Sequence, residues 1–344
     1  MKRFALVLTL LLSACSNVQS PLPKAASRIS WPAGLPVYDH VVIVVEENKD
    51  YEQIIDNPAA PYINKTLRAE GANLTRMYAE EHHSQGNYFW LFSGSNQNVG
   101  FNDRIPATLF TARNLGSQLI GPKHSFKGYA EDLPAIGSTV HTAGLYARKH
   151  VPWISFSNIP DGKTAATSSN LRFKDFPADF KDLPTVSFVI PNLVNDMHNG
   201  TVPAGIKAGD NWLQEHIGGA HGYYEWAKQN NSLLILTFDE NDHGPTGLTN
   251  PAAPQPPRRN RIVTILAGAH VKAGDYKEGK GVTHVNVLRT LEAMYGLERS
   301  GAQQPLALAA GIADDFIIKD VFVPGGVGVN AGVRAGAQPA AAPL

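Results

Sequence analysis

The chain has 344 residues, of which 43% are hydrophobic and 17% are charged, and its formal net charge is zero. This composition is typical of a folded protein and excludes a wholly disordered chain. The neutral charge and the lack of a basic stripe argue against nucleic acid as a partner. The length allows about two domains, and the single cysteine excludes an intramolecular disulfide.

The first 14 residues have the features of a secretory signal peptide. Lys2 and Arg3 precede an apolar run over residues 4–12 that is too short to span a bilayer. The sequence that follows, Leu-Ser-Ala-Cys, resembles a bacterial lipobox, in which Cys15 is lipidated and becomes the mature N-terminus. The alternative is an ordinary cleaved signal with a chance cysteine. We therefore expect an exported protein, anchored by lipid to the outer membrane or periplasmic face, or secreted.

The rest of the chain is expected to contain one folded unit between two irregular ends. Residues 15–36 are rich in Ser, Pro and Ala and predict a linker. Residues 323–344 are mostly Gly, Ala, Val and Pro and predict a disordered tail. The folded unit is therefore expected over 37–322, and we expect it to be a monomer.

Apolar runs of strand length alternate with helical patterns along this unit. Strands are predicted at 40–45, 126–129, 153–156, 185–190, 233–238 and 261–266. Helices are predicted at 61–71, from residue 84 onward, at 212–229, and from residue 284 to a glycine stop at Gly296. This alternation predicts an α/β fold with a largely parallel central sheet and helices on both faces.

Acidic residues follow two of the most apolar predicted strands. Glu46 and Glu47 end the first run, and Asp239 and Glu240 follow the run at 233–238. Ligands of such sheets bind beyond the carboxyl ends of the strands. Four carboxylates gathered there would repel one another unless a cation lay among them, and oxygen ligands favour Mg²⁺, Ca²⁺ or Mn²⁺ over Zn²⁺. The alternative for each acid pair is a solvated loop.

Ser84 stands at the predicted start of a helix. This position places its hydroxyl beside backbone N–H groups that have no intrahelical partner, which suits an incoming phosphate. The alternative is that Ser84 only caps the helix, because serine is a preferred N-cap residue.

An ordered series of motifs resembles the bacterial phosphoesterase family. They are EENKDY (46–51), HHSQGNY (82–88), IPNLVNDMHN (190–199), GDNWL (209–213), TFDEND (237–242) and THVNVLRTLEAMYGL (283–297). The family contains acid phosphatases and phospholipases C, has an alkaline phosphatase-like fold, and includes members that act on phosphatidylinositol 3-phosphate. The resemblance therefore implies a metal-dependent phosphomonoesterase, an acid phosphatase that acts through a phosphoserine intermediate.

The resemblance also implies roles for individual residues. It implies four metal ligands, which are Glu47, Asn48, Asp239 and Glu240. Ser84 would be the nucleophile and His198 a phosphate ligand or general acid. The expected substrate-binding residues are Asn87, His150, His284 and Lys149. Lys149 has the alternative of a loop-ordering charge, and His198 that of a buried histidine bonded near Asp196.

Two departures from the family pattern affect the loop of the nucleophile. His83 and Gly86 stand where the family segment has prolines, which loosens the loop and leaves the pH optimum and substrate preference open. Two other functions remain as alternatives. One is a phospholipase C-like diesterase, which needs a pocket for diacylglycerol, and the other is an inactive metal-binding surface lipoprotein.

Overall fold

The computed structural model describes residues 34–242, 244, 246–254 and 259–323. The predicted signal peptide, Cys15, nearly all of the linker and almost the whole predicted tail lie outside these residues, so those expectations stay predictions. Over the part that is described, no helix has both the length and the apolar character needed to cross a membrane.

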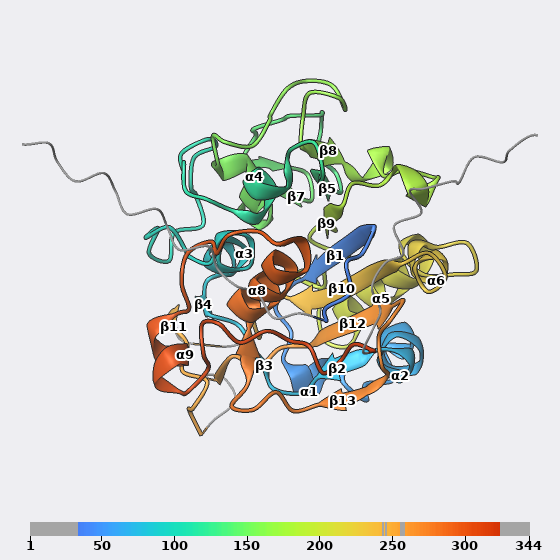
Figure 1. The fold of residues 1–344 in the computed structure, drawn as a ribbon, viewed down its shortest axis with the longest axis vertical. Helices are drawn as coiled ribbons and strands as arrows, with labels where there is room; N and C mark the ends of the chain where they lie inside the picture. Colours follow the sequence, from blue (N-terminus) through green and yellow to red (C-terminus); the bar gives the residue numbers. More distant parts are fainter. Residues whose placement is uncertain (1–33, 243, 245, 255–258, 324–344) are drawn as a thin grey trace, which may run out of the picture. The chain divides into compact units, whose positions relative to one another are not determined.

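A central sheet of eight strands organises the fold (Figure 1). In spatial order the strands are β13 (Gly274–Tyr276), β2 (Ala72–Leu74), β12 (Thr264–Gly268), β10 (Ser232–Phe238), β1 (His40–Glu46), β9 (Val186–Ile190), β5 (Phe126–Ala130) and β8 (Asn170–Arg172). Only β12 pairs antiparallel with its neighbours in this sheet. Because β10, β1, β9 and β5 are mutually parallel, their carboxyl ends meet at one edge.

Helices cover both faces of the sheet, as the alternating pattern predicts. Figure 1 shows α3 (Ser84–Ser93) and α8 (His284–Tyr295) on one side. It shows α2 (Arg68–Glu70), α5 (Ala204–His216) and α6 (Tyr223–Ala227) on the other. Strand β1 is buried from Val41 to Glu46 because helices shield both faces, which explains its unbroken apolar sequence.

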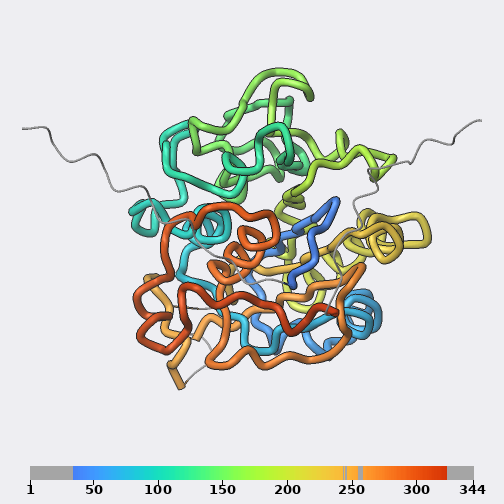
Figure 2. The backbone as a smooth tube through the Cα atoms, in the orientation of Figure 1, coloured from blue at the N-terminus to red at the C-terminus, as the bar shows by residue number. Residues whose placement is uncertain are grey.

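Shorter elements connect these layers. The short helices are α1 (Tyr51–Ile54), α4 (Leu115–Leu119) and α9 (Pro305–Ala309). Three two-stranded ribbons pair β4 (Glu81–His82) with β11 (Gly247–Leu248), β3 (Met77–Tyr78) with β14 (Val282–Thr283), and β6 (Thr142–Ala143) with β7 (Tyr146–Ala147). In Figure 2 the last described residues run from α9 back across the fold, where the Lys272 N–H donates to Val321 O.

For three elements the structure differs from the sequence prediction. The expected strand at 153–156 is a 3₁₀ helix, Pro152–Ser155, whose first residue is a proline with a fixed φ. The expected helix at 212–229 is divided between α5 and α6 by a glycine-rich turn at 217–222. The strand expected at 261–266 is shifted to Thr264–Gly268. In each case proline or glycine geometry, or the pairing register, outweighed the apolar pattern.

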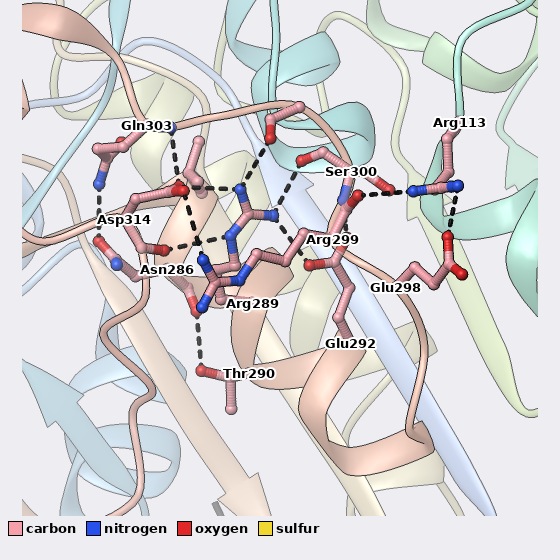
Figure 3. Close-up of polar contacts among 12 residues, drawn as sticks. Arg113, Asn286, Arg289, Thr290, Glu292, Glu298, Arg299, Ser300, Gln303 and Asp314 are labelled. Carbon is pink, nitrogen blue, oxygen red and sulfur yellow. Dashed lines mark hydrogen bonds and ion pairs between the residues drawn. The ribbon is translucent and has the colours of Figure 1, made fainter. Parts of the chain in front are cut away.

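Arg289 ties the segment after α8 to that helix. Its guanidinium is fully buried and lies 2.9 Å from Glu292 Oε2 and 2.8 Å from Asp314 Oδ1 (Figure 3). It also donates to the carbonyl oxygens of Ser300 and Gly301. A buried charge needs such partners to offset its lost hydration, so this one side chain holds several turns of irregular chain in place.

Candidate active site

Two acidic segments leave the sheet side by side. Glu46 is opposite Phe238 in the parallel pairing of β1 with β10, so residues 47–48 and 239–240 emerge together. The Asn48 N–H lies 3.2 Å from Asp239 Oδ1, and the Asn48 amide donates to Glu240 Oε1 at 2.8 Å. Sequence reasoning expected this meeting of strand ends, and the structure brings the four expected metal ligands into one group.

Ser84 joins this group from the start of α3. Its Oγ lies 3.2 Å from Glu47 Oε2 and 3.1 Å from Glu240 Oε1, and the side chain is buried. His83 occupies the N-cap position with extended backbone, and Ser84 is the first helical residue. The hydroxyl is therefore directed at carboxylates rather than at helix N–H groups, and the interpretation of Ser84 as only a cap is wrong.

His150 is held between two buried carboxylates. Its Nε2 lies 3.0 Å from Glu47 Oε1, and its Nδ1 lies 3.5 Å from Asp196 Oδ2. Burial lowers the pKa of His150, but Glu47 and Asp196 raise it to about 9. Burial likewise raises the pKa of Glu47, but His150, with Lys149, brings it below its usual value. The pair is therefore charged at neutral pH.

Lys149 and His198 stand nearer to solvent than His150. The Lys149 ammonium lies 3.5 Å from Asp103 Oδ2. The His198 side chain is exposed, and its ring centroid lies 6.1 Å from that of His150. The backbone N–H of His198 donates to Asp196 Oδ1. The alternative of a buried His198 is therefore wrong, because the loop after β9 turns this side chain outward.

Asn87 and His284 are buried beside the site but have other partners. Asn87 Oδ1 accepts from the N–H groups of Glu80 and Glu81, and its amide donates to Glu81 O.

His284 Nε2 donates to Phe238 O at 2.9 Å, and burial lowers the pKa of His284 to about 4. These contacts order the backbone around Ser84 and Asp239, so they do not support direct contact of either side chain with a phosphoryl group.

Two contributors escaped sequence reasoning. The Tyr88 hydroxyl donates to Glu47 Oε1 at 2.9 Å, and its ring stacks on His150 with centroids 5.2 Å apart. His82 Nδ1 is in direct contact with Glu240 Oε2. The spacing of four residues between Ser84 and Tyr88 was a usable signal, because such residues share a helix face.

The acidic group has buried oxygen atoms that suit a cation. Asn48 Oδ1 and Asp239 Oδ2 are buried without a hydrogen-bond partner. Burial raises the pKa of Asp239 well above its usual value, and the neighbouring Glu47 and Glu240 raise it further. The described residues contain no ready-made cluster of three His, Cys, Asp or Glu side chains that could hold a metal ion. Even so, the oxygen atoms without partners and the closely spaced carboxyl groups fit a hard cation. Its positive charge would offset the repulsion between the carboxylates, and water molecules would complete its coordination.

Comparisons with known proteins agree on one family. A model of the phosphoesterase family matches residues 56–298. A phosphatidylinositol-3-phosphatase of Mycobacterium tuberculosis is 46% identical over 78% of this chain and 81% of its own length. An acid phosphatase of Aspergillus fumigatus is 28% identical over 74% of this chain, which spans only 54% of the fungal enzyme.

A solved structure confirms the predicted fold class. It is a protein in the alkaline phosphatase superfamily from Vibrio parahaemolyticus, with a TM-score of 0.51 and 11% identity. The alignment covers 81% of this chain and 69% of that one. At this identity the similarity concerns the fold alone.

Proposed function

This chain belongs to the phosphoesterase family, and we propose that it is a phosphomonoesterase in which Ser84 is the nucleophile. Its relatives include a phosphatidylinositol-3-phosphatase and acid phosphatases, so it is a hydrolase of phosphate esters. One observation supports the assignment of Ser84 most strongly. Its hydroxyl, at the first turn of a buried helix, lies within 3.2 Å of a carboxylate from each of two adjacent strand ends.

A divalent cation is part of the proposal. Glu47, Asn48, Asp239 and Glu240 would hold it, with Mg²⁺, Ca²⁺ or Mn²⁺ fitting these oxygens better than Zn²⁺. When bound, it would supply Lewis-acid stabilisation of negative charge near Ser84.

The chain's own groups would carry two displacement steps. Ser84 Oγ attacks phosphorus, its proton passes to an adjacent carboxylate, and the bond from phosphorus to the leaving oxygen breaks. His198, exposed at the rim, would give a proton to that oxygen. Water then gives a proton to His198 and attacks the phosphoserine, the bond from phosphorus to Ser84 Oγ breaks and phosphate leaves, and Ser84 regains its proton from the carboxylate. Tyr88 and His150 keep Glu47 oriented throughout.

The proposal also covers the substrate and the location of the protein. The substrate would be a phosphate monoester and, by similarity to the mycobacterial relative, would include phosphatidylinositol 3-phosphate. The lipid anchor at Cys15 and a monomeric state belong to the same proposal and rest on the sequence pattern.

The test compares p-nitrophenyl phosphate with bis-p-nitrophenyl phosphate as substrates. Wild type and Ser84→Ala are assayed across acid to alkaline pH, before and after EDTA and after adding back each cation. We expect turnover of the monoester only, loss in Ser84→Ala, and restoration by one divalent cation. A preference for the diester would favour a phospholipase C-like enzyme. Activity that survives in Ser84→Ala would remove the nucleophile, and inactivity with every cation would favour the surface lipoprotein.

A further inference from the structure

Two loop segments near Ser84 carry positive side chains, one before α4 and the other around the β6–β7 ribbon. Arg104 lies in the loop before α4, His141 precedes β6, and Lys149 follows β7. These loops are joined by Arg148, whose guanidinium donates to Ile105 O at 3.0 Å and to Thr139 O. The cluster is therefore a built feature, held by backbone contacts, rather than a chance grouping of mobile chains.

The cluster adjoins the nucleophile. Asp103 Oδ1 accepts from the N–H of Gln85, the residue after Ser84, at 3.4 Å. Asp103 Oδ2 pairs with Lys149. One carboxylate thus connects the first turn of α3 to the positive loops, and Arg104 is the next residue along the chain.

Burial lowers the pKa of Lys149, but Glu47, Asp103, Asp239 and Glu240 raise it, so the excess of positive charge in the cluster lies around His141 and Arg104. Burial lowers the pKa of His141, and Arg148, Arg104 and Lys149 lower it further against the opposing effect of Asp103. The positive field at His141 therefore exceeds the negative one. Among the described residues, the exposed Arg104 guanidinium has neither an ion pair nor a hydrogen bond. An exposed arginine with a free planar donor set is suited to a phosphate or carboxylate.

We propose that Arg104, with His141 and Lys149, binds a second anionic group of the substrate, carried on the leaving group beside the phosphate that Ser84 attacks. This inference rests on the proposed function and narrows the substrate class to monoesters that carry a further anion. A phosphodiester is one such anion, and it can belong to a lipid in a membrane or to the water-soluble headgroup of that lipid.

The test uses three substrates with the full protein, in the presence of the divalent cation that restores activity after EDTA treatment. They are p-nitrophenyl phosphate, which has no second anion, soluble glycerophosphoinositol 3-phosphate, and phosphatidylinositol 3-phosphate in phosphatidylcholine vesicles. The variants are Arg104→Gln, Arg104→Lys, and a matched control, Arg113→Gln. Arg113 pairs with Glu298 beyond the far end of α8 and is half exposed (Figure 3). The measured quantity is the ratio of kcat/KM for each inositol phosphate to that for p-nitrophenyl phosphate.

We expect Arg104→Gln to lower this ratio about tenfold for both inositol phosphates, mainly through KM, because one charge-assisted contact is lost. Arg104→Lys should restore part of the ratio, and Arg113→Gln should leave it unchanged. An unchanged ratio in Arg104→Gln would overturn the inference. A loss confined to vesicles would also overturn it, because that result indicates attraction to a membrane surface. Wild type inactive on all three substrates would instead refute the proposed function itself.

Discussion

Nε2 of His150 lies 3.0 Å from Oε1 of Glu47, and both side chains are buried. The second oxygen of Glu47 faces Ser84 Oγ at 3.2 Å. One carboxylate therefore touches the proposed nucleophile on one side and a positive imidazole on the other. His150 is too deeply buried to contact a substrate in this arrangement. We therefore infer that it fixes the position of the Glu47 side chain and keeps that carboxylate ionised.

Replacing His150 should reduce activity, although His150 does not contact the substrate, because Glu47 depends on it. His150→Gln keeps a hydrogen-bond donor but removes the positive charge, which leaves Glu47 buried and poorly paired. We expect kcat/KM for p-nitrophenyl phosphate to fall at least tenfold, or about 1.4 kcal/mol. His124→Gln is the matched control, because His124 lies just before β5, at the opposite end of that strand from the site. Near wild-type activity in His150→Gln would contradict the assignment.

Cation binding should be visible as stabilisation, independent of turnover. A cation that binds only the folded protein adds about 2.7 kcal/mol at a hundred times its Kd. We therefore expect Mg²⁺, Ca²⁺ or Mn²⁺ to raise the Tm of EDTA-treated protein, and Asp239→Asn to remove most of that rise. The comparison variant is Asp275→Asn, since Asp275 pairs with Arg68 at the β13 edge of the sheet. An equal rise in wild type and Asp239→Asn would place the cation elsewhere.

Glu80 should make the folded protein less stable as pH rises. Burial raises its pKa from 4.5 to about 8, although the Thr283 hydroxyl and the Val285 N–H act in the opposite direction. Between these two pH values the folded state binds more protons than the unfolded state. Stability from this group is therefore full below about pH 4.5 and is lost as pH rises to about 8.

The variant Glu80→Gln tests this linkage. It should flatten the fall of the unfolding free energy between pH 5 and 8, where one fully linked proton contributes about 1.4 kcal/mol per pH unit. Urea unfolding at several pH values measures the slope. An equally steep slope in Glu80→Gln would show that other groups carry the linkage.

Arg289 should be a major determinant of stability. Arg289→Leu removes the cation and leaves Glu292, which is fully buried, without its charged partner. We expect a loss of about 3–5 kcal/mol in the free energy of unfolding. The double variant Arg289→Leu/Glu292→Leu should recover part of that loss, because the uncompensated charge is gone. Arg172→Leu, which disrupts a more exposed pair with Asp175, should cost far less. Equal losses for the two arginines would contradict this account.

Much of the fold was predictable because it depends on local pattern. The unbroken apolar runs of β1 and β10 identify buried parallel strands, and Gly296 ends α8 in the left-handed conformation that glycine adopts easily. The errors arose where local pattern carries little information. An apolar sequence such as Trp153–Phe156 can pack equally well as a strand or as a 3₁₀ turn.

The sequence by itself determined which chemical groups are present and which strand ends carry them. Parallel pairing then makes the meeting of Glu47 with Asp239 and Glu240 a consequence of topology. The roles of other residues were decided only by the tertiary structure. A contact between residues far apart in sequence directs the His150 ring to Glu47, and the fold of the segment before α3 directs the Asn87 amide to the backbone of Glu80 and Glu81. A side chain's partner depends on packing in three dimensions, and local residue spacing cannot specify it.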